Sequence, residues 1–179
     1  FFSITLSLFL YFTYKKEALF IIKKSGIPGI VGGIAMAIGF TAYVFAMSKT
    51  TVANVLFIIS TQTIWLALFG YFFLKEKISF KTFLSIILAM IGISVMIGGS
   101  LSTGSIQGNL VALFIPINFA FLILLIRKYS NLDLIPALFY GGLIVTIVAF
   151  FMTETILISG HNLLVGFLLG TFQHAFGFI

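Results

Sequence analysis

The chain has 179 residues, of which 61% are hydrophobic and 8% are charged, so it has too little polar surface to cover a water-soluble globule. Its formal net charge of +6 comes from residues in short gaps between apolar runs. That distribution argues against a nucleic-acid-binding face and for membrane topology signals. The sequence contains no cysteine, which excludes disulfides and thiolate metal sites within these residues.

Seven apolar segments follow one another along the chain, and each complete one has about the length of a membrane-spanning helix. They are residues 1–14, 28–47, 52–74, 82–98, 109–126, 132–151 and 163–179. None alternates as a barrel strand does, so backbone hydrogen bonding inside lipid requires helices. The sequence predicts an all-α integral membrane protein, a polytopic helical bundle. We expect the first and last segments to be cut within helices, which would make the chain a fragment.

Positive charges fall on alternate connections between these segments. The connections after the first, third and fifth segments hold all the basic residues except Lys49. Cytoplasmic loops of membrane proteins carry an excess of Lys and Arg. We therefore expect residues 15–27, 75–81 and 127–131 on the cytoplasmic side.

An internal repeat is visible in two G-x-x-x-G motifs 137 residues apart, Gly29 with Gly33 and Gly166 with Gly170. The loop before the first motif is basic, and the equivalent loop before the second is not. Opposite threading of two copies through the membrane predicts this difference, as in inverted-repeat transporters. Close helix packing alone also explains such glycine pairs, and this alternative stays open.

The stretch from residue 39 to residue 99 contains AYVFAMSKTTVANVLFI followed by WLALFGYFFLKEK. A helix ending in Ala-rich aromatic sequence, a very short loop and a next helix closing in Leu-Lys-Glu resemble the EamA-type domain of the drug/metabolite transporter superfamily. The resemblance implies ten helices in two inverted five-helix halves, of which seven lie here. Residues 1–99 would be a first repeat lacking its first helix, and residues 100–179 a second repeat truncated after its third.

Two residues bear on helix regularity. Thr63 stands where many relatives in that family place a proline, so we expect the helix there to be unbroken. Pro116 lacks a backbone N–H and leaves the carbonyl of Ala112 without its usual partner, which predicts a kink beside Asn118.

Polar side chains near the middle of the apolar segments are the candidate substrate-binding residues: Gln62, Trp65, Asn118, Gln173 and His174. Buried polar groups at that depth are costly unless they are paired or used. The alternative is that the three amides are interhelical hydrogen-bonding contacts without a solute. If transport is coupled to protons, the candidate here is the histidine, whose alternative is neutral burial with one hydrogen bond.

Three further residues are candidates for a gate or for helix-end contacts. Glu76 lies at the predicted cytoplasmic end of its helix between two lysines, where an interfacial salt bridge or helix-end anchor competes with a gate role. Tyr43 and Asn54 lie on either side of the tight loop around Lys49. They line an outer vestibule or satisfy helix ends.

Enzyme signatures such as G-x-S-x-G, H-E-x-x-H and the phosphate-binding G-x-x-x-x-G-K are absent, so we expect no enzyme, cofactor or metal site. With the resemblance, the sequence predicts a secondary transporter of a small metabolite or drug-like solute, working by alternating access in a bacterial cytoplasmic (inner) membrane. One alternative is a non-transporting membrane scaffold or assembly subunit. Another is a nucleotide-sugar or sugar-phosphate exchanger of the same superfamily.

Overall fold

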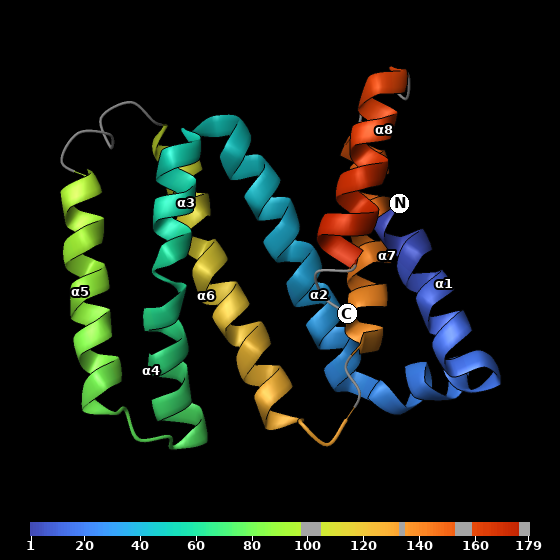
Figure 1. Ribbon diagram of the computed structural model, residues 1–179, viewed down its shortest axis with the longest axis horizontal. Helices are drawn as coiled ribbons and strands as arrows, with labels where there is room; N and C mark the ends of the chain where they lie inside the picture. The colour runs from blue at the N-terminus through green and yellow to red at the C-terminus, as the bar shows by residue number, and fades with distance from the viewer. Residues whose placement is uncertain (98–104, 133–134, 153–158, 176–179) are drawn as a thin grey trace. The chain divides into compact units, whose positions relative to one another are not determined.

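The computed structural model describes residues 1–97, 105–132, 135–152 and 159–175, some of them by their backbone alone, and every regular element among them is a helix (Figure 1). The elements are α1 (Phe2–Tyr14), η1 (Lys15–Glu17), α2 (Ala18–Lys49), α3 (Val52–Ser60), α4 (Gln62–Leu74), α5 (Phe80–Ile97), α6 (Ile106–Lys128), α7 (Ile135–Met152), α8 (Gly160–Leu168) and η3 (Leu169–Ala175). The predicted all-helical class is confirmed.

Among the described residues, four helical stretches are long and apolar enough to cross a membrane. They are Phe20–Lys49, Val52–Leu74, Ile106–Lys128 and Ile135–Met152. Many large apolar side chains along the helices are exposed, among them Phe12, Phe72 and Phe151. Such a surface suits contact with lipid, because acyl chains are as apolar as these side chains.

By its packing the chain falls into two units. The first joins residues 1–37 with residues 130–179, and the second consists of residues 38–129. This division differs from the predicted one at residue 99, which rests on the family resemblance rather than on packing. The repeat boundary therefore stays a prediction.

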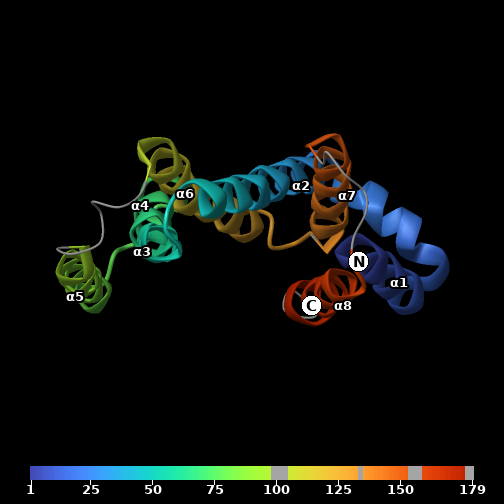
Figure 2. The same cartoon turned by 90° about the horizontal axis from the view of Figure 1, so that it is seen from above.

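In the first unit α1 lies against α7 and η3, and Figure 2 shows α1 beside the C-terminal helices. Leu6 is fully buried on α1. Hydroxyl groups accompany the apolar contact: Ser3 Oγ lies 3.2 Å from Thr146 Oγ1, and Thr5 Oγ1 lies 3.2 Å from Thr171 Oγ1. Such pairs satisfy polar groups where lipid offers no partner.

The first G-x-x-x-G motif packs α2 on α7 in the same unit. A Cβ atom placed on Gly33 would lie 2.5 Å from Cβ of Tyr140 and 3.0 Å from the backbone nitrogen of Gly141. At Gly166, in the second motif, the nearest atoms are those of the Phe1 ring, at 3.9 Å. Of these two glycines, Gly33 thus permits a close backbone approach.

In the second unit α6 packs along α3 and α4 (Figure 1). Its core is a cluster of small and β-branched side chains: Ala46, Val55, Ile58, Ala112 and Ile115. Hydroxyl caps begin two of the helices, because Thr51 Oγ1 accepts from the Asn54 N–H at the start of α3 and Ser105 Oγ accepts from the Gly108 N–H at the start of α6. Each such cap contributes about 1 kcal/mol.

The predicted connection over residues 15–27 is helical for most of its length. The helix η1 and the start of α2 occupy it, with backbone bends at Lys15 (φ 47°) and Gly26 (φ 52°). Figure 1 shows the chain turning from α1 into this first part of α2 before the long part rises. No glycine or proline interrupts residues 18–25, so helix is their natural state.

The helix predicted to be unbroken near Thr63 is divided at Thr61, which separates α3 from α4. The Ser60 and Thr61 hydroxyls donate to the carbonyls three residues earlier, at 2.6 and 2.7 Å. These side chains compete with backbone N–H groups for the same carbonyl oxygens. Two hydroxyl groups therefore accompany the break. The prediction from the sequence had considered only a proline as a cause of such a break.

Pro116 does not interrupt α6, which is one helix from Ile106 to Lys128. Both Ala112 and Pro116 are buried. A further irregularity lies in the last element, where η3 is a π-helix. Such helices are rare, and insertions of this kind occur frequently at functional sites.

Candidate functional site

Gln62 is the first residue of α4, directly after the break at Thr61. Its side chain is half-buried. No hydrogen bond joins its carboxamide to any residue in the described part of the chain, whereas the neighbouring Thr63 hydroxyl donates to the carbonyl of Ser60 at 3.3 Å. Among the described residues, neither the donor nor the acceptor of the Gln62 amide is therefore used.

Trp65 follows one turn later and is also half-buried. Its ring is 6.3 Å from that of Phe69, which in turn lies 5.7 Å from the ring of Phe73, so the three form an aromatic stripe along α4. Within the residues that the structure describes, no acceptor meets the indole N–H. Trp65 thus combines a packed ring with an uncommitted donor.

Asn118 is in a different position, because it is only 7% exposed. A Cβ atom added to Gly39 would lie 2.7 Å from Nδ2 of Asn118, so the amide sits tightly against α2. Next to it the Phe119 and Phe40 rings form an edge-to-face pair at 6.1 Å. This environment favours helix–helix packing for Asn118 over direct contact with a solute.

Gln173 and His174 belong by their backbone to η3 in the first unit, and their side chains lie outside the described part of the structure. Gln62, Trp65 and Asn118 belong to the second unit. The predicted cavity shared by all five residues therefore stays a prediction.

Asn54 is 1% exposed and belongs to a polar cluster at the α2–α3 turn. The Thr50 hydroxyl donates to Oδ1 of Asn109 at 2.6 Å. Nδ2 of Asn54 donates to Thr50 Oγ1 at 3.2 Å and to Asn109 Oδ1 at 3.4 Å. Asn109 of α6 thereby accepts one bond from the α2–α3 turn and one from α3.

Two further details concern the burial and packing of this cluster. Oδ1 of Asn54 is buried and has no hydrogen-bond partner among the described residues. A Cβ atom on Gly108 would lie 2.9 Å from the backbone of Lys49. Tyr43, the other residue predicted near this turn, is half-buried and packs against the core of the second unit.

Glu76 has two structural roles. Its N–H donates to the carbonyl of Gly70 at 3.1 Å and closes the C-terminus of α4, after Lys75 in the left-handed conformation. Its carboxylate pairs with Arg127 at 3.0 Å, and both side chains are about half exposed, at 50% and 45%.

The lysines adjacent to Glu76 are conspicuous in the sequence, whereas its partner Arg127, 51 residues later, was not predicted. The sequence did contain a signal for this pair, because the alternation of charged connections placed Glu76 and Arg127 on the same predicted side of the membrane. A cavity of about 270 Å³ adjoins the pair. It is lined by Thr63, Leu66, Ala67, Glu76, Lys77, Ile78, Thr82 and Arg127.

The family comparison bears on α1 to α5. A model of the EamA-like transporter family matches residues 1–98, more than half of the chain. The chain belongs to the EamA-like transporter family. Searches of curated proteins and of solved structures found no match.

Membership makes this an integral membrane protein of the drug/metabolite transporter superfamily and confirms the resemblance read from the sequence. The matched EamA region includes Gln62, Trp65 and Glu76, whereas Asn118 and η3 lie beyond it. Among the described residues, no group of three His, Cys, Asp or Glu side chains could hold a metal ion.

In this EamA-family chain we expect the Glu76–Arg127 pair to stabilise little, because solvent screens half-exposed charges. Glu76→Gln or Arg127→Gln should each lower the free energy of unfolding by less than about 1 kcal/mol. Thermal unfolding of the detergent-solubilised full-length protein measures this. In the double variant the two losses should not add, and additive losses would show that the charges do not interact.

Proposed function

We propose that the protein is a secondary transporter that moves a small metabolite or drug-like solute across the membrane by alternating access, with Gln62 and Trp65 in contact with the solute. Family membership supports the transport class. The observation that carries the residue assignment is the half-buried Gln62 amide, which has no partner among the described residues and lies at a helix break.

The break at Thr61 supports the same assignment. A transporter helix that is interrupted in the apolar layer exposes backbone donors and acceptors there, and these are common solute contacts. The combined stretch of α3 and α4 is 23 residues long and otherwise apolar enough to span a membrane. The Thr61 N–H and carbonyl are bonded to Ile58 and Ile64, so a polar solute beside Gln62 would meet the side-chain amide and the indole N–H of Trp65 on one stretch of chain.

In this proposal Asn118 positions α6 against α2 and does not bind solute, because its amide is packed against Gly39. Gln173 and His174 remain candidates on η3, with His174 the candidate for proton coupling. The absence of acidic and basic side chains from the Gln62 and Trp65 turn suits a neutral or weakly charged solute.

Transport assays of the full-length protein in proteoliposomes test the proposal. A panel of labelled amino acids, monosaccharides and nucleosides, together with the lipophilic cation ethidium, should include a solute with saturable flux. We expect Gln62→Leu to reduce kcat/KM for that solute about tenfold or more, because a solute group that bonded the amide then enters an apolar site unpaired.

The matched control is Gln107→Leu, which makes the same side-chain change at an exposed residue near the start of α6. That variant should transport like the wild type. If no member of the panel shows saturable flux, the scaffold alternative is favoured. If both variants lose flux equally, the role assigned to Gln62 is wrong.

A further inference from the structure

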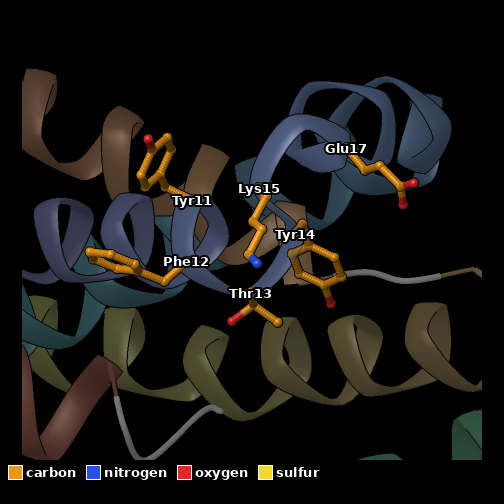
Figure 3. Close-up of a pocket in the computed structure, with 6 residues that line it drawn as sticks. All are labelled: Tyr11, Phe12, Thr13, Tyr14, Lys15 and Glu17. Atoms are coloured by element: carbon orange, nitrogen blue, oxygen red, sulfur yellow. The ribbon is translucent and has the colours of Figure 1, made fainter.

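Two adjoining cavities surround the bend between α1 and α2, which we call the elbow (residues 11–25). One has a volume of about 720 Å³ and is lined by Tyr11, Phe12, Thr13, Tyr14, Lys15 and Glu17 (Figure 3). The other has a volume of about 280 Å³ and is lined by Glu17, Phe20, Ile21, Lys24 and Ser25. Both cavities contain aromatic and basic side chains, and Glu17 borders each of them.

The second cavity lies along one face of η1 and the first part of α2. Residues 17, 20, 21 and 24 have the spacing of a single helical face. On this face Phe20 is 63% exposed, and Lys24 is exposed one turn later. Exposed aromatic and basic residues together are typical of helices that lie in the membrane interface.

The elbow is held to the rest of its unit. The Ser25 hydroxyl, which is buried, donates to the carbonyl of Ile22 at 2.7 Å, and the Tyr140 hydroxyl of α7 donates to the same carbonyl at 3.4 Å. Gly26 then turns the chain with a positive φ, a conformation that favours glycine. The carbonyl of Ile22 therefore ties the end of the elbow to α7.

The charged groups of the elbow are not committed to one another. Lys15, Lys23, Lys24 and Glu17 are exposed, and none forms an ion pair with a side chain that the structure describes. Figure 3 shows the Glu17 carboxylate pointing away from the Lys15 ammonium group. With Lys16, residues 15–24 carry four lysines against one glutamate. A basic cluster of this kind beside apolar helix attracts anionic phospholipids.

We propose that the elbow binds the anionic phosphodiester headgroup of a membrane phospholipid, with Lys15 and Lys24 contacting the phosphate and Phe20 lying among the acyl chains. A lipid suits the site better than a free phosphate ion, because the lysines adjoin exposed aromatic side chains. The predicted cytoplasmic side of residues 15–27 places the elbow at the leaflet rich in anionic lipid. The proposal does not depend on the transport function.

Native mass spectrometry of the full-length protein in detergent tests this, with phosphatidylglycerol and phosphatidylcholine as alternative probes. The wild type should retain phosphatidylglycerol in preference. Lys15→Gln with Lys24→Gln should weaken that retention, by about fivefold for each lysine removed. The matched control, Lys77→Gln with Lys81→Gln, removes the same charge from another predicted cytoplasmic connection and should retain the lipid.

Two further arms decide between related ligands. Glu17→Gln should increase phosphatidylglycerol retention, since it removes a like charge beside the phosphate, and a decrease would contradict an anionic headgroup. Inorganic phosphate at millimolar concentration should not displace the lipid, and displacement would assign the site to a soluble anion. Equal retention of the two lipids, or equal loss in both double variants, would also overturn the proposal.

Discussion

Gly33→Ala is expected to destabilise the protein by about 2 to 3 kcal/mol. The added Cβ would lie 2.5 Å from Cβ of Tyr140 and 3.1 Å from the carbonyl oxygen of Ala137. Relief requires α2 and α7 to separate, because the contact atoms are backbone or Cβ atoms that no rotamer change can move. The apparent melting temperature of the detergent-solubilised full-length protein should fall by roughly 5 to 10 °C.

Gly92→Ala is the matched control, because an added Cβ at this position in α5 meets no atom within 4 Å. Alanine is the better helix former by about 1 kcal/mol, so this variant should be neutral or stabilised. The same substitution should therefore lower the stability at Gly33 and leave it unchanged or raise it at Gly92. A Gly33→Ala variant as stable as the wild type would show that α2 and α7 do not approach closely at this point.

Asn109→Leu is expected to cost about 1 to 3 kcal/mol, because the half-buried Thr50 hydroxyl and the buried Nδ2 of Asn54 lose the Oδ1 that accepts from them. Asn54→Leu should cost clearly less. It removes an Oδ1 that is already without a partner among the described residues and an Nδ2 whose two acceptors, on Thr50 and Asn109, stay bonded to each other. Leucine also has a similar volume. Thermal unfolding of both full-length variants measures the difference.

The test is which of the two variants, Asn109→Leu or Asn54→Leu, loses more stability. If Asn54→Leu is the more damaging change, then Oδ1 of Asn54 has a partner such as a bound water molecule, and the cluster is not organised around Asn109. Gln107→Leu serves as the control for both variants. This residue is exposed on the first turn of α6, so its replacement reports the cost of an amide-to-leucine change without burial.

The positions of the predicted helices agree closely with the structure where composition alone decides them. The predicted segment over residues 109–126 lies within α6, and the segment over residues 132–151 largely coincides with α7. Long apolar runs between charged or small residues leave helix as the conformation that satisfies the backbone inside lipid. The membrane class likewise followed from composition, because the fraction of hydrophobic residues is high and the fraction of charged residues is low.

Irregularities within the helices were predicted poorly. The break occurs at Thr61, where the helix was expected to be unbroken, and η3 is a π-helix. The helix α6 is continuous through Pro116, and the kink predicted beside Asn118 stays a prediction. A proline within a predicted helix can be identified directly from the sequence. A serine or threonine hydroxyl bends a helix only when its local rotamer and the surrounding packing favour bonding back to a carbonyl.

The sequence by itself determined that this protein lies in a membrane, that its segments are helical and that it is of the EamA type. Each of these properties depends on composition or on a local sequence pattern. The tertiary structure alone decided which polar groups are already satisfied. Asn118 and Asn54 are packed or bonded, whereas the Gln62 amide has no partner among the described residues. Pairing depends on distances between residues far apart in the chain, such as Glu76 and Arg127, and no local pattern encodes those distances.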